Sequence, residues 1–135
     1  MKVPTKVTLD TNVLISALLT PGNSRKIVEL SARRKILLFS SPEIEGELRR
    51  TLRDKLKYDN AELAQALIVY RETVHKVVYP KKKLKVVTSD KTDNRILEAA
   101  SEGNVGYAVT GDKHLLGLGK YKKILILNPS GFLNP

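Results

Sequence analysis

The stretch Leu9-Asp10-Thr11-Asn12-Val13-Leu14-Ile15-Ser16-Ala17 passes from a predicted strand into a predicted helix, and it decides the fold class. Residues 3–9 are apolar or β-branched at alternate positions, which predicts a strand that ends at Asp10. Residues 12–19 then predict a short helix that is closed by Thr20-Pro21-Gly22. A strand followed directly by a helix is the unit from which layered α/β folds are built.

The rest of the chain repeats this alternation. Apolar runs predict further strands at residues 36–39, 107–110 and 124–127, and they permit a short one at 76–79. One helix is predicted to follow the caps Asn23 and Ser24 and to end at about residue 34, and another to run from the cap Ser41-Pro42 to about residue 56. Two further helices are predicted, over residues 60–75 and from about residue 92 to about 101, the last ended by Gly103 in a left-handed conformation. Strands separated by helices predict one domain over residues 1–135, a three-layer α/β/α fold around a central, mainly parallel sheet.

The composition limits the classes of protein and of metal site. Hydrophobic residues make up 41% of the 135 residues, which is enough for a core. No apolar run approaches the roughly 20 residues of a membrane helix, and residues 1–6 lack the features of a signal peptide, so we expect a cytoplasmic protein without a membrane partner. Without cysteine and with two histidines, the chain must hold any metal ion through oxygen ligands.

The charge points to a polyanionic partner. The formal net charge is +10, and lysine and arginine near phosphates release condensed counterions. The candidate RNA contacts are the cationic residues in two short stretches, Arg49, Arg50 and Arg53, and Lys81, Lys82 and Lys83. The alternative is that these charges are only solvated and serve solubility.

Two predicted strands lead into an aspartate. Asp10 follows the first strand, and Asp112 follows the strand 107–110 after one glycine. The carboxyl ends of parallel strands lie at one edge of the sheet, where ligands of open α/β sheets bind. Either aspartate alone could be a helix cap or a turn residue, but two on one edge favour a site.

Asp93 adds support that depends on helical geometry. It lies on the same side of the predicted helix as Ile96, Leu97 and Ala100, which is the apolar side. Aspartate is rarely buried unless it is paired or bound to a metal. The alternative is that Asp93 caps the helix, a role for which Asp90 is better placed.

Two glutamates compete for a fourth position. Glu45 and Glu47 lie at opposite margins of the apolar stripe that contains Ile44, Leu48 and Leu52. Because both are about equally far from the centre of that stripe, the periodicity does not choose between them.

The ordered acidic motifs resemble those of the PIN domain family. Residues 9–17, quoted above, are similar to its opening motif, and residues 90–100, DKTDNRILEAA, resemble its third acidic motif. Residues 110–116, TGDKHLL, resemble the fourth. The resemblance covers residues 7 to about 133, and it is strongest to the prokaryotic branch of toxins from toxin–antitoxin pairs, the VapC-like proteins.

This resemblance implies roles for particular residues. It assigns the catalytic, metal-binding acids to Asp10, Glu47, Asp93 and Asp112, and it prefers Glu47 to Glu45 because a leucine follows Glu47. The polar residues that support the acids would be Asn12, Thr110 and Asp90. Lys91 stands where relatives often have proline. Clustered carboxylates need cations, and oxygen ligands favour Mg²⁺ or Mn²⁺.

The implied activity is that of a metal-dependent endoribonuclease, with RNA as the substrate and a homodimer as the expected assembly. The leading hypothesis is a toxin restrained by a small antitoxin protein. The alternatives are a nuclease of RNA processing or decay without an antitoxin, and a non-catalytic module that binds RNA or protein.

Overall fold

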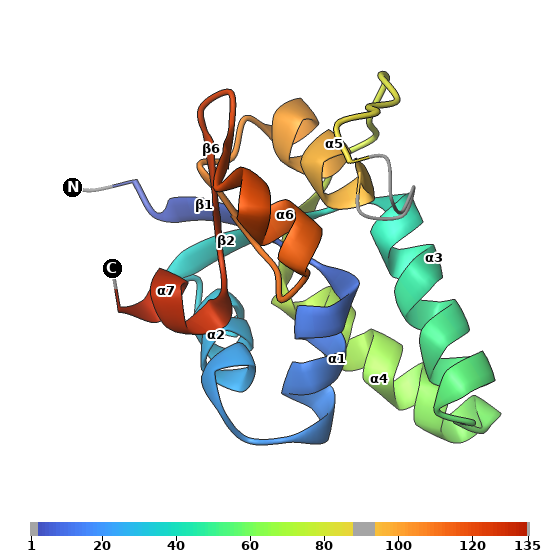
Figure 1. Cartoon of the computed structure of the whole chain (residues 1–135). Coiled ribbons are helices and arrows are strands. Elements are labelled where there is room, and N and C mark those ends of the chain that lie inside the picture. Colours follow the sequence, from blue (N-terminus) through green and yellow to red (C-terminus); the bar gives the residue numbers. More distant parts are fainter. Residues whose placement is uncertain (1–2, 88–93, 135) are drawn as a thin grey trace.

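A computed structural model describes residues 3–87 and 94–134 (Figure 1). The strands are β1 (Thr5–Leu9), β2 (Ile36–Ser40), β3 (Val74–Val77), β4 (Tyr107–Val109), β5 (Lys120–Tyr121) and β6 (Ile124–Leu127). The α-helices are α1 (Thr11–Leu19), α2 (Asn23–Ala32), α3 (Pro42–Arg50), α4 (Asn60–Thr73), α5 (Asn94–Gly103), α6 (Lys113–Leu118) and α7 (Pro129–Leu133). A π-helical turn, η1 (Thr51–Lys55), continues α3.

The strands form one sheet in the order β3-β2-β1-β4-β6-β5. Only β5 is antiparallel to its neighbour in this described sheet, so the predicted α/β fold with a mainly parallel sheet is confirmed. Figure 1 shows α5 on one side of the sheet and α1 and α2 on the other. Because helices cover both faces, β2 and the second half of β1 are buried on both sides, which explains the continuous apolar sequence of β2.

The first and third helices begin as their sequences predict. Asp10 caps α1, and its side chain accepts a hydrogen bond from Thr11 N. Ser41 caps α3 by accepting from Ile44 N, with Pro42 in the first turn. Proline suits this position because the first helical N–H groups have no partner inside the helix. Each cap follows directly on a strand, so both helices start at the carboxyl edge of the sheet.

Several local predictions are wrong. Gly22 caps α2 without a side-chain hydrogen bond, whereas Asn23 and Ser24 lie inside the helix. Gly103 is the last residue of α5 and the left-handed residue is Asn104, with a φ of 51°. Gly103 is constrained by packing instead, because a Cβ there would lie 2.6 Å from Phe39 Cδ2.

The strand β3 is displaced, because it begins two residues before the predicted 76–79. The short elements β5 and α7 were not predicted, and the two-residue β5 is too short to show a period. Asn128-Pro129 ends β6 and also starts α7, since the Asn128 side chain accepts from Gly131 N. No helix within the described ranges is long and apolar enough to cross a membrane.

Candidate active site at the carboxyl edge of the sheet

The parallel pairing of β1 and β4 brings Asp10 beside the end of β4. Leu9 is aligned with Val109, and Asp10 N donates a 2.9 Å hydrogen bond to Val109 O. Residues 110–112 therefore continue past β4 next to Asp10. This confirms that the two aspartates predicted at strand ends share one edge of the sheet.

Asp10 is 8% exposed, and both of its carboxylate oxygens accept hydrogen bonds. Oδ1 accepts from Thr11 N at 2.8 Å and so caps α1. Oδ2 accepts from Thr110 Oγ1 at 2.7 Å. A buried carboxylate is costly without such partners, and these bonds fix the direction of both oxygens.

Thr110 connects the two aspartates through a single hydroxyl group. Its side chain is fully buried, its hydroxyl donates to Asp10 Oδ2, and the same oxygen accepts from Asp112 N at 3.0 Å. Thr110 therefore directly contacts Asp10, the acid that it is predicted to support.

Asp112 uses one carboxylate oxygen as a helix cap. Oδ1 accepts from His114 N at 2.8 Å and from Leu115 N at 3.2 Å. Oδ2 accepts no hydrogen bond from the part of the chain that the structure describes. The residue as a whole is half-buried.

Glu45 and Glu47 have different surroundings. Glu45 Oε1 accepts from Arg71 Nε at 3.1 Å, and Glu45 Oε2 lies 3.9 Å from Arg49 Nη2. Glu45 is therefore paired with a cation on α4. Glu47 is half-buried and lies about 200° further round α3, since each helical residue advances about 100°. It thus projects from a different side of the helix than the Glu45–Arg71 pair.

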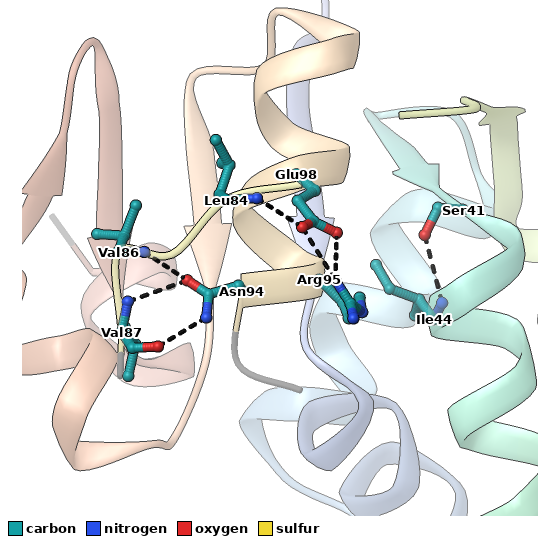
Figure 2. Close-up of polar contacts among 8 residues, drawn as sticks. All are labelled: Ser41, Ile44, Leu84, Val86, Val87, Asn94, Arg95 and Glu98. Atoms are coloured by element: carbon teal, nitrogen blue, oxygen red, sulfur yellow. Dashed lines mark hydrogen bonds and ion pairs between the residues drawn. The ribbon is translucent and has the colours of Figure 1, made fainter. Parts of the chain in front are cut away.

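Asp90 and Asp93 lie outside the described residues, but the residues on both sides of them are held together. Asn94 is 3% exposed, and its Oδ1 accepts from Val86 N at 2.9 Å and from Val87 N at 3.0 Å. Its Nδ2 donates to Val87 O at 2.7 Å (Figure 2). The side-chain amide of Asn94 thus pairs with the backbone as a neighbouring strand would. No role was predicted for Asn94, whose partners lie in an irregular segment.

Glu98 is a second residue without a predicted role. It is 5% exposed, Arg95 Nη1 donates to both of its oxygens at 2.8 and 2.9 Å, and Leu84 N donates to Oε2 at 2.8 Å (Figure 2). One turn further, Glu102 Oε1 accepts from Lys81 N at 3.0 Å. The spacing of Asn94, Glu98 and Glu102 by four residues was the available signal, because it places three acceptors on one helical face.

The remaining candidate residues lie on α1, on α3 with its π-helical continuation, and in the segment before α5. Asn12 is exposed in the first turn of α1, and its side chain makes no hydrogen bond within residues 3–87 and 94–134. Arg49 pairs with Glu45 and Arg53 with Asp54, while the Arg50 guanidinium lies against Gly46. Lys81, Lys82 and Lys83 are exposed beside the later turns of α5.

The donor chemistry at this edge suits a hard divalent cation. Asp10 and Asp112 offer carboxylate oxygens, the ligands that Mg²⁺ and Mn²⁺ prefer. Within the described ranges, no three acidic or histidine side chains come close enough to form a complete metal site. The third predicted acid, Asp93, lies outside those ranges, so its contribution stays a prediction.

The comparisons with known proteins agree with this geometry. The family model described as PIN domain matches residues 6–114. The chain is 34% identical over 131 residues to the uncharacterized protein MJ1680 of Methanocaldococcus jannaschii, covering 94% of this chain and 83% of that protein. The fold of this chain is similar to that of a chain in the crystal structure of VapBC2 from Rickettsia felis bound to a DNA fragment from their promoter. The TM-score is 0.67 and the sequence identity 16%, and the match covers 92% of this chain and 98% of that chain.

Proposed function

Because the chain belongs to the PIN domain family, we propose that it is a metal-dependent endoribonuclease whose active site is the carboxyl edge between β1 and β4. The observation that carries this proposal is the Asp10–Thr110–Asp112 arrangement. One buried hydroxyl holds a buried carboxylate and the backbone of a second acid, whose Oδ1 caps the next helix. A merely structural pair of helix caps would not need the bridging Thr110.

In the proposed mechanism, Asp10 and Asp112 are the principal ligands of Mg²⁺ or Mn²⁺. Asp93 completes the inner group, while Glu47 holds a second ion or orients the attacking water. When bound, the ion supplies a water of lowered pKa, polarises the scissile phosphate and stabilises the leaving oxygen. The water oxygen bonds to phosphorus as the bond to the ribose 3′ oxygen breaks and that oxygen gains a proton, which leaves 5′-phosphate and 3′-hydroxyl ends.

We further propose that the protein is a homodimeric toxin controlled by a small antitoxin. The similar Rickettsia structure is of a VapBC pair. An apolar cavity of about 350 Å³ opens between α1, α2 and α4 and would accept an apolar partner segment. Its lining includes Leu14 and Leu18 of α1, Val28 of α2 and the 41%-exposed Val69 of α4. A short reading frame for an antitoxin beside this gene would support this role over RNA processing or decay.

The decisive experiment incubates a mixed RNA pool with the protein and Mg²⁺, Mn²⁺ or EDTA. We expect cleavage with either metal ion, none in EDTA, and losses of about 100-fold or more for Asp10→Asn and Asp112→Asn. These exceed the roughly 10- to 100-fold that loss of a supporting residue costs. Equal cleavage by all three proteins would refute the site and indicate a contaminating nuclease. RNA binding without cleavage would favour the non-catalytic module.

A further inference from the structure

The segment that precedes α5 carries a run of lysines and is attached along that helix. Lys81 N, Leu84 N and the amides of Val86 and Val87 donate to Glu102, Glu98 and Asn94 in turn. Residues 81–87 therefore run antiparallel to α5, with their amides directed at its side chains. This arrangement orders a segment that has no secondary structure of its own.

The acids nearest to these lysines, Glu98 and Glu102, already bind other groups. Glu98 is buried and binds Arg95 together with Leu84 N, and Glu102 accepts a backbone N–H group. Neither acid forms an ion pair with a lysine in residues 3–87 and 94–134, where the four ion pairs all involve arginine. The lysine charges beside α5 are thus left to solvent or to a partner.

Two further lysines, Lys122 and Lys123, lie near this segment in the turn before β6. Lys122 lines a hollow of about 270 Å³ together with Lys81 and Lys82. It also lines a hollow of about 410 Å³ that includes Lys123 and Asn104. Lys83 and Lys85 are exposed in the same segment as Lys81 and Lys82. We call the exposed lysines of this segment and of the turn the lysine strip: Lys81, Lys82, Lys83, Lys85, Lys122 and Lys123.

Part of the lysine strip lies at the edge of the sheet opposite the candidate active site. Lys122 and Lys123 directly precede β6, whereas Thr110 and Asp10 follow β4 and β1, which run parallel to it. The four residues of β6 span about 13 Å at roughly 3.3 Å each. A molecule that contacted both places would have to be extended, as an RNA chain is.

We propose that the lysine strip is a second RNA-binding surface, which binds the phosphate backbone at a distance from the scissile bond. This inference rests on the proposed function for its ligand. Uncompensated lysines around two hollows suit phosphates, which need positive charge without a fixed sequence. Tyr79, which directly precedes Pro80 at the border of the smaller hollow, is 70% exposed, and an exposed aromatic ring beside lysines suits a single-stranded RNA more than an acidic protein.

The test measures RNA binding in EDTA, so that its result does not depend on cleavage. The strip variant is Lys82→Gln/Lys83→Gln/Lys122→Gln/Lys123→Gln, and the probe is a labelled single-stranded RNA of about 30 nucleotides. We expect Kd for this RNA to rise about tenfold or more at low salt, and the salt dependence to fall by about 0.7 for each lost phosphate contact.

A variant with the same net charge is the control. Lys26, Lys35, Lys55 and Lys57 are exposed on or after α2 and η1, so their replacement by Gln removes four charges elsewhere. Equal weakening by both variants would overturn the proposal, as would wild-type binding by the strip variant or no RNA binding by the wild type. If the protein bound RNA through the lysine strip but did not cleave it, the proposed nuclease activity would be refuted and the proposed binding surface would stand. Strip-dependent binding of an acidic protein alone would also overturn the proposal.

Discussion

The carboxyl edge of the sheet has two halves that share one plan and differ in chemistry. In the half formed by β1 and β4, the chain continues from each strand to an aspartate that caps the next helix, Asp10 for α1 and Asp112 for α6. In the half formed by β2, the strand ends at Ser40 and Ser41 caps α3. Both halves thus use strand ends and helix caps, but only one of them uses carboxylates as the caps.

The difference follows from the number of oxygens on each cap. A carboxylate can cap a helix with one oxygen and keep the other for a second partner, as Asp10 does with Thr110. The Ser41 hydroxyl is occupied by Ile44 N, and Ser40 shares a buried hydrogen bond with Tyr70. The β2 half is therefore closed by neutral groups. A strand end alone does not make a candidate site, whereas an acidic cap beside a second acid does.

Removing the Thr110 hydroxyl should have the largest effect in this comparison. Thr110→Val keeps the shape of the side chain but removes the hydroxyl that donates to Asp10 Oδ2 and accepts from Asp112 N. We expect RNA cleavage to fall about 10- to 100-fold, and the free energy of unfolding to fall by about 1–3 kcal/mol. Cleavage assays and urea titrations measure the two effects. Thr110→Ser should retain both, and wild-type cleavage by Thr110→Val would contradict the bridging role.

The neutral half can be tested through the titration of Tyr70. The pKa of Tyr70 is raised to about 12, chiefly by burial and to a smaller extent by the charge of Glu45, while the Ser40 hydrogen bond and the charge of Arg71 lower it. Between pH 10 and 12 the unfolded chain loses the phenol proton while the folded chain keeps it, so stability falls as pH rises. We expect Tyr70 to contribute about 1–3 kcal/mol to this fall.

Tyr70→Phe isolates that contribution, because the other titrating groups are common to both proteins. Urea unfolding at pH 9 and pH 12 should show a smaller fall in stability for Tyr70→Phe than for the wild type. An equal fall in both proteins would mean that the phenol ionises in the folded state as it does in the unfolded one. Because Tyr70 is bonded to Ser40 at the end of β2 and not to Asp10 or Asp112, the variant should not alter the metal dependence of RNA cleavage at neutral pH.

Much of this arrangement of strands and caps could be predicted from the sequence, because it depends on residues that are neighbours in the chain. The apolar run of β2 reflects burial on both faces, and the Ser41-Pro42 cap is visible in two adjacent residues. The same signal at Asn128-Pro129 was interpreted only as the end of a strand, although it also begins a helix. Glycine at 103 suggested a left-handed turn, whereas its role is close packing against Phe39.

The contacts that connect distant segments could not be derived in this way. Asp10 and Thr110 are 100 positions apart, and only the pairing of β1 with β4 brings them together. The partners of Asn94 lie in an irregular segment that has no period to detect. The sequence could therefore nominate acids and a supporting threonine, but it could not show which oxygen each group engages.

The choice between Glu45 and Glu47 is the smallest test of the comparison, since both lie on the helix that starts from the neutral half. The structure pairs Glu45 with Arg71, and exposed ion pairs of this kind contribute at most about 1 kcal/mol. We therefore expect Glu45→Gln to leave RNA cleavage near the wild-type rate. Glu47→Gln should lower cleavage about tenfold, in the range for a group that orients water or other ligands. If Glu45→Gln were the damaging change, the acidic site would extend across α3 to Arg71, and the preference for Glu47 would be wrong.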